Sequence, residues 1–132
     1  MKAARRSLVV AVAVGLVAAT VVMASAAAVP ANREISLKPA TAYPNARGAA
    51  QYQSQAGQSE FQLEVEHLRS LARHRVLVYV NGTKIGTARV SSRGVAELSR
   101  NSELRQRVPN VQAGTTVRVQ TSGGAVIVSG IF

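Results

Sequence analysis

The chain has 132 residues, with 16 Lys and Arg against 6 acidic residues and a formal net charge of +10 at neutral pH. It contains no Cys, which excludes disulfide bonds, thiol chemistry and Cys-based zinc sites. It has no Trp, three Tyr and two Phe, which disfavours the aromatic platforms used to bind neutral polysaccharides or single-stranded nucleic acids.

The first 28 residues have the pattern of a bacterial signal peptide. Lys2, Arg5 and Arg6 form a basic start, residues 8–23 are apolar, and small residues follow that allow cleavage after Ala26 or Ala28. The alternative is an uncleaved N-terminal membrane anchor, because the apolar run approaches the roughly 20 residues that cross a bilayer. We therefore expect a secreted, periplasmic or cell-envelope protein.

Three segments follow from this pattern: a signal peptide over residues 1–28, a proline-containing segment over 29–47 and a β core over 48–132. Without the three basic residues of the signal peptide, 13 basic and 6 acidic residues remain, a net charge of +7. This excess favours anionic partners. Outside a bacterial membrane these are anionic envelope polymers, lipid head groups or extracellular DNA.

The first strands are predicted from alternating apolar and polar residues. Residues 34–38 form a strand that Pro39 closes, and we expect it at a sheet edge. Residues 47–54 form a second strand, and residues 55–58 a turn. In the strand over residues 60–66 the alternation is complete, so Phe61, Leu63 and Val65 point inward.

Residues 75–90 are predicted to form a tight hairpin with Asn81 and Gly82 at its tip, because this pair adopts the positive φ angles that a two-residue loop needs. The expected partners are Val80 with Thr83, Tyr79 with Lys84, Val78 with Ile85, and Val76 with Thr87. A strand over residues 95–99 follows.

Residues 115–121 and 125–132 are predicted to form a closing hairpin around Gly123 and Gly124. The expected partners are Thr121 with Val126, Val119 with Val128, and Val117 with Gly130. The eight short strands predict an all-β fold, a single antiparallel sandwich of immunoglobulin-like type, with a small β-barrel as the alternative.

Two linkers concentrate arginine. Residues 67–75 are predicted to make a turn of helix, and residues 100–114 are predicted to cross over the fold. Convergence of the two linkers at one end would create an anion-binding site, since guanidinium groups bind phosphates and carboxylates through two hydrogen bonds. The candidate residues are Arg69, Arg73, Arg75, Arg100, Arg105 and Arg107.

Four runs resemble a group of small secreted bacterial proteins with no assigned activity: VYVNG at residues 78–82, GT at 86–87, VPNVQAG at 108–114 and VSGIF at 128–132. The resemblance implies an exported all-β domain and supplies no site residues.

No residue pattern predicts an enzyme, a cofactor or a metal site. Glu64, Glu66 and His67 lie close in sequence, but outward carboxylates of an alternating strand are normally solvated. We expect an exported, non-enzymatic module with a binding or structural role at the cell envelope, in contact with anionic polymers or surfaces. The alternatives are a protein-interaction domain that uses a sheet edge, near residues 33–38, and an unrecognised enzyme. Sequence-specific nucleic-acid binding is not expected.

Overall fold

The computed structural model describes residues 31–132, so the predicted signal peptide lies outside the described residues. The described chain forms eight β-strands and two single 3-10 turns, and it contains no α-helix. The strands are β1 (Ala31–Pro39), β2 (Arg47–Gln55), β3 (Gln58–Glu66), β4 (Arg75–Val80), β5 (Thr83–Arg89), β6 (Ala96–Asn101), β7 (Thr116–Thr121) and β8 (Val126–Ile131). The 3-10 turns are η3 (Arg69–Leu71) and η4 (Ser102–Leu104). The predicted all-β class is confirmed.

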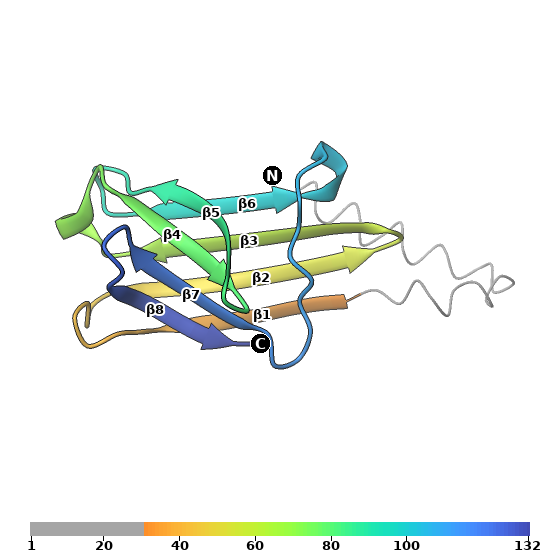
Figure 1. Cartoon of the computed structure of the whole chain (residues 1–132), viewed down its shortest axis with the longest axis horizontal. Coiled ribbons are helices and arrows are strands. Elements are labelled where there is room, and N and C mark those ends of the chain that lie inside the picture. The colour runs from red at the N-terminus through yellow and green to blue at the C-terminus, as the bar shows by residue number, and fades with distance from the viewer. Residues whose placement is uncertain (1–30) are drawn as a thin grey trace, which may run out of the picture.

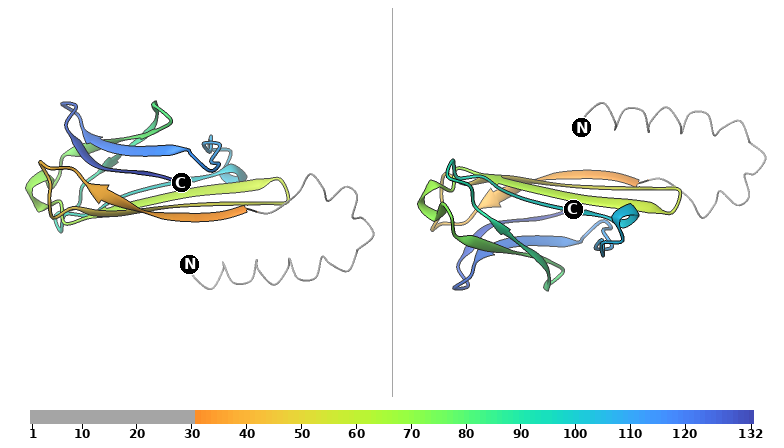
Figure 2. Two further views of the ribbon diagram at one scale, coloured as in Figure 1. Left: turned by 90° about the horizontal axis from the view of Figure 1, so that it is seen from below. Right: turned by 90° about the horizontal axis from the view of Figure 1, so that it is seen from above.

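All strand pairs are antiparallel and belong to one sheet, in the order β5-β4-β7-β8-β1-β2-β3-β6. The sheet folds over so that β4, β5, β7 and β8 (the β4 half) face β1, β2, β3 and β6 (the β3 half), as Figures 1 and 2 show. The result is a nearly closed, barrel-like sheet. Its order differs from that of an immunoglobulin domain, because β1, β2 and β3 are consecutive neighbours here.

The sheet stays open between β5 and β6, which form the two ends of the strand order. Arg100 of β6 reaches across this seam and donates from Nη2 to the carbonyl oxygen of Ile85 at 3.3 Å. Gly86 leaves the space that the guanidinium occupies, since a Cβ there would collide with Arg100. A side chain therefore bridges the seam where no backbone ladder does.

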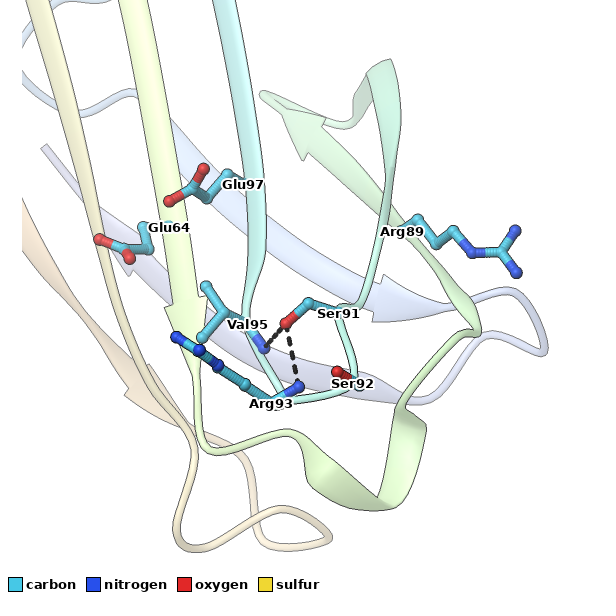
Figure 3. Close-up of a pocket in the computed structure, with 7 residues that line it drawn as sticks. All are labelled: Glu64, Arg89, Ser91, Ser92, Arg93, Val95 and Glu97. Carbon is cyan, nitrogen blue, oxygen red and sulfur yellow. Dashed lines mark hydrogen bonds between the residues drawn. The ribbon is translucent and has the colours of Figure 1, made fainter. Parts of the chain in front are cut away.

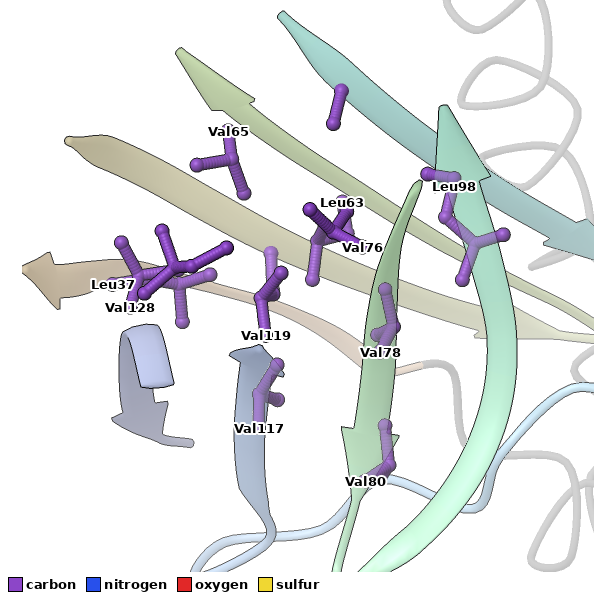
Figure 4. Packing of buried hydrophobic residues seen from close by; sticks show 14 of the residues in the cluster. Leu37, Leu63, Val65, Val76, Val78, Val80, Leu98, Val117, Val119 and Val128 are labelled. Atoms are coloured by element: carbon purple, nitrogen blue, oxygen red, sulfur yellow. The ribbon is translucent and has the colours of Figure 1, made fainter. Parts of the chain in front are cut away.

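The core lies between the two halves and is almost entirely aliphatic. Phe61, Leu63 and Val65 of β3 are buried as their alternation predicts. They share one cluster with buried valines of the facing strands, and Figure 4 shows how Leu63 and Val65 lie among these valines. The valines of the β4 half in this cluster are Val76, Val78, Val80, Val117, Val119 and Val128.

The hairpin of β4 and β5 turns at Asn81 (φ 50°) and Gly82 (φ 79°), which confirms the predicted tip. The pairs of Val80 with Thr83 and of Tyr79 with Lys84 are also confirmed, but a bulge at Ile85 shifts the rest of the ladder. The predicted pairs Val78–Ile85 and Val76–Thr87 are wrong: Val78 pairs with Gly86, and Val76 with Ala88. Without the bulge, Arg89 would point into the core instead of Ala88.

A second bulge affects the closing hairpin of β7 and β8. Val119 pairs with Val128 as predicted, but Gln120, and not Thr121, pairs with Val126. Ile127 is left between two pairs, and both Ile127 and Val128 are fully buried. The extra residue thus places two consecutive apolar side chains in the core.

The position of β1 differs from the prediction of an edge strand. β1 lies between β8 and β2, because Lys38 and Pro39 pair with Ser129 and Val128. Its remaining residues, 31–37, pair with β2 alone. β1 thus joins the two halves of the sheet at one end and behaves as an edge along the rest of its length.

Candidate anion-binding surfaces

The two arginine-rich linkers lie at opposite ends of the fold. The first linker, residues 67–75, follows the end of β3, where Val65 pairs with Ala96. The second linker begins at the end of β6, where Asn101 pairs with Glu60. Five residue steps separate these two pairs, or about 17 Å along an extended strand. Figure 1 shows η3 and η4 at the two ends of the molecule. The six candidate arginines therefore do not form one patch.

Within the second linker, Arg100 has a structural role at the seam. Its guanidinium donates to the carbonyl oxygen of Ser99 at 3.0 Å from Nη1, in addition to that of Ile85. Arg105 ends η4 in the left-handed conformation (φ 61°), and its side chain and that of Arg107 are exposed. Only these two remain available for binding at that end.

Within the first linker, Arg69 and Arg73 are exposed on the turn that contains η3. Arg75 begins β4 and pairs with Arg89 of β5, so two like charges lie side by side on the outer surface of the β4 half. Arg75 is thus the one candidate residue that belongs to a sheet surface.

Cationic side chains gather on the outside of the β4 half and at the adjoining end of β1, a surface that the sequence did not predict. Along β4, β5 and β7, apolar side chains that point into the core alternate with side chains that point outward. We call this surface the basic face. Its cationic residues are Lys38, Arg75, Lys84, Arg89 and Arg118.

Part of the basic face is a single transverse row with one residue on each of five adjacent strands. Lys84 pairs with Tyr79, Tyr79 with Arg118, Arg118 with Ser129, and Ser129 with Lys38. Adjacent strands lie about 4.8 Å apart, so successive cations along this row are separated by about 10 Å. Residues with a hydroxyl group, Tyr79 and Ser129, occupy the positions between them.

Arg118, at the centre of this row, is held by two neighbours. Its guanidinium carbon lies 4.7 Å from the centre of the Tyr79 ring, within the range of a cation–π contact. Its Nε donates to Oε1 of Gln120 at 3.0 Å. Among the residues that the structure describes, none accepts a hydrogen bond from its two terminal nitrogens. The guanidinium of Arg118 is therefore held in place, and its two terminal nitrogens remain available to a ligand.

The opposite outer surface, on the β3 half, is acidic. It carries five of the six acidic residues of the chain and, apart from Lys38 at the end of β1, one cation from β2, Arg47. We call it the acidic face. Its acidic residues are Glu34, Glu60, Glu64, Glu66 and Glu97.

Two carboxylates of the acidic face, Glu64 of β3 and Glu97 of β6, form a cross-strand pair. Partial burial and the neighbouring charges of Glu97 and Glu66 raise the pKa of Glu64 above its usual 4.5. The two carboxylates repel each other when both are charged. The two outer surfaces thus have opposite character.

Two shallow hollows lie beside the β5–β6 turn, the second of them also bordered by Arg69 of η3, and Figure 3 shows the first. Ser91 lines it, but its hydroxyl already accepts hydrogen bonds from the backbone nitrogens of Arg93 and Val95, both at 3.2 Å. In Figure 3 the side chain of Arg89 points away from Glu64 and Glu97. The hollow therefore does not gather its charged groups around one point.

Glu66 and His67 line the second hollow together with Arg69. Within residues 31–132, no three His, Cys, Asp or Glu side chains are grouped so that they could hold a metal ion. No helix of this described part of the chain is long and apolar enough to cross a membrane.

Comparison with known proteins gives no family for this chain. No protein-family model matches it, and a search of curated proteins finds no match. The resemblance to small secreted bacterial proteins stays a prediction, and the function has to be argued from the two surfaces.

Proposed function

We propose that this protein is an exported, non-enzymatic β module that binds linear anionic polymers of the bacterial cell envelope through its basic face. The observation that supports the proposal is the separation of charge. Four cationic residues and no acidic residue point outward from the β4 half, and Lys38 at the adjoining end of β1 adds a fifth cation, whereas five of the six acidic residues point outward from the β3 half. Such a field orients the molecule toward an anionic partner.

A polymer fits this face better than a lipid surface does. Proteins that lie on a membrane combine electrostatic attraction with the burial of apolar side chains. In the described chain the large exposed apolar side chains are Leu104 and Ile131, and Leu104 belongs to η4, away from the basic face. The basic face therefore offers charge and hydrogen bonding with one exposed apolar residue, Ile131.

The face supports binding without a chemical step. Lys and Arg side chains on an open surface attract an anion, but nucleophilic catalysis also needs a base beside a nucleophile and a group that orients the base. The basic face presents no carboxylate for that purpose.

The proposal is tested by measuring the affinity for an acidic polysaccharide as a function of salt concentration. The double substitution Lys84→Gln with Arg89→Gln removes two charges from the basic face, and we expect it to weaken binding about 5- to 30-fold at low salt, given about 0.5–1 kcal/mol for each exposed contact. The salt dependence should also become shallower because fewer counterions are released.

The matched control is Arg105→Gln with Arg107→Gln, which removes the same charge at the other end of the fold. It should leave the affinity nearly unchanged. Equal losses for both double variants would show that net charge alone attracts the polymer, and this outcome would overturn the assignment to the basic face. Stronger binding to anionic lipid vesicles than to any polymer would also overturn it.

A second candidate function, protein interaction through a sheet edge, is favoured by the pairing of β1. Residues 31–37 pair only with β2, and Ala40 donates from its backbone nitrogen to Ile127 on the other side at 2.8 Å. By alternation, the N–H groups of Asn32, Glu34 and Ser36 point to this same unpaired edge. An extended segment of a partner can add there as a further strand.

Glu34→Pro removes one of these outward N–H groups, and proline is tolerated at sheet edges. We expect this variant to keep its fold and to lose a protein partner that binds by strand addition. The variant Lys84→Gln with Arg89→Gln should keep that partner. A partner lost in the second variant and kept in the first would contradict the edge hypothesis.

A further inference from the structure

The transverse row on the basic face alternates between cationic and hydroxyl-bearing side chains. In spatial order the residues are Lys84, Tyr79, Arg118, Ser129 and Lys38. Each lies on a different strand, so the alternation is set by strand pairing and not by neighbouring positions in the sequence. A ligand that lies across the strands meets a cation at every second strand.

We propose that the row binds an acidic polysaccharide in which charged and neutral sugar units alternate, with Arg118 as the residue that determines this specificity. The inference rests on the proposed function and deepens it. Cations about 10 Å apart match carboxylates on alternate units. The hydroxyl groups of Tyr79 and Ser129 lie where the neutral units would contact the surface, and they can donate to or accept from sugar hydroxyls.

Arg118 has this role because its orientation is fixed before the ligand binds. The Tyr79 ring supports the guanidinium at 4.7 Å, and Gln120 accepts from Nε at 3.0 Å. Both terminal nitrogens are then left without an acceptor among the described residues, and two such nitrogens bind the two oxygens of a carboxylate at once. A lysine carries the same charge, but its ammonium is a point charge and cannot form this pair of parallel hydrogen bonds.

The other cations of the row lack this support. Lys84 and Lys38 are exposed, and no hydrogen bond to a described residue restrains their ammonium groups. They contribute charge to binding rather than a defined geometry. The matched control for Arg118→Lys is Arg107→Lys, which makes the same change and keeps the net charge at an exposed arginine outside the basic face.

The experiment compares three polymers of matched length by titration calorimetry at moderate salt: hyaluronan, with a carboxylate on every second sugar; polygalacturonate, with one on every sugar; and inorganic polyphosphate. We expect hyaluronan to bind at least as tightly as polygalacturonate despite its lower charge density. Arg118→Lys should weaken hyaluronan binding about ten-fold without changing the slope of affinity against salt, and Arg107→Lys should change neither.

A second variant separates the hydroxyl pattern from the guanidinium. Ser129→Ala removes one exposed hydroxyl and no charge, and it should reduce the preference for hyaluronan while leaving polyphosphate binding unchanged. Circular dichroism of each variant serves as the check that the fold is kept.

The outcomes separate this inference from the function on which it rests. If affinity rises simply with charge density and Arg118→Lys behaves like Arg107→Lys, the specificity is overturned and general anion binding remains. If Arg118→Lys weakens polyphosphate more than hyaluronan, the anion recognised is a phosphate and the polysaccharide assignment is overturned. If none of the three polymers binds in a salt-dependent manner, the proposed function itself fails.

Discussion

Two bulged residues, Ile85 in β5 and Ile127 in β8, determine which side chains of these strands reach solvent. The bulge at Ile85 directs Arg89 outward, and the bulge at Ile127 places Ile127 and Val128 together in the core. Alternation alone could predict β3, where polar and apolar residues follow one another without interruption. It could not predict the bulges, because nothing in the local pattern marks an extra residue.

The raised pKa of Glu64 leads to a prediction about pH and stability. The pKa of Glu64 is near 4.5 in the unfolded chain and higher in the folded protein. The repulsion between Glu64 and its neighbours is therefore absent below pH 4.5 and complete above the pKa of the folded protein. Stability from this carboxyl therefore falls as pH rises through that interval. Glu97→Gln should raise the free energy of unfolding at pH 7 by up to about 0.5 kcal/mol, since like charges directly opposite are destabilising.

Urea unfolding at pH 7 and at pH 4 checks this prediction, and the gain should shrink at pH 4. Glu103→Gln is the control, because it removes the same charge from η4. In a protein with a net positive charge, loss of an acidic group is otherwise unfavourable. If Glu103→Gln raised the free energy of unfolding as much as Glu97→Gln does, the gain would not come from repulsion between Glu64 and Glu97.

At the scale of elements, the hairpin of β4 and β5 also fixes the start of β7. Asn81 accepts a hydrogen bond at Oδ1 from the backbone nitrogen of Thr116 at 3.0 Å, and its own backbone nitrogen donates to the carbonyl oxygen of Thr116 at 2.9 Å. The turn geometry could be predicted because it is local. The contact with Thr116 could not, since 35 positions separate the two residues.

A pair of substitutions separates these two roles of Asn81. Asn81→Gly keeps the positive φ and loses only the side-chain acceptor, so it should destabilise the fold by about 0.5–1.5 kcal/mol. Asn81→Ala loses the acceptor and also strains the turn, which costs a further 1 kcal/mol or so. Chemical unfolding measures both values, and equal stability of the two variants would contradict the need for a left-handed residue.

The seam between β5 and β6 gives a third prediction. Gly86→Ala should displace the Arg100 guanidinium and crowd Leu98, whose Cδ1 would lie 3.2 Å from the new methyl group. We expect a loss of about 1 kcal/mol, because the hydrogen bond to Ile85 is lost while the strand gains rigidity. In the background of Arg100→Ala the same change should cost less. Additive effects in this double-mutant cycle would show that Arg100 does not occupy the space beside Gly86.

At the scale of the whole molecule, the separation of charge depends on pairing between distant segments. Tyr79 and Arg118 are neighbours because β4 pairs with β7, and Glu64 and Glu97 because β3 pairs with β6. The sequence predicted a basic protein and two arginine-rich linkers, but strand order carries those linkers to opposite ends. The basic face arises from residues that look scattered in the sequence and become adjacent only in the sheet.

The most direct test of this interpretation is a residue-level map of the bound surface. Amide chemical shifts of the 15N-labelled protein are recorded by NMR during a titration with hyaluronan. Binding through the basic face predicts that the largest shifts occur at Tyr79, Lys84, Arg118 and their neighbours, and that Glu64 and Glu97 stay unchanged. Largest shifts at Arg69 and Arg73 or at Arg105 and Arg107, or no shifts at low salt, would contradict it.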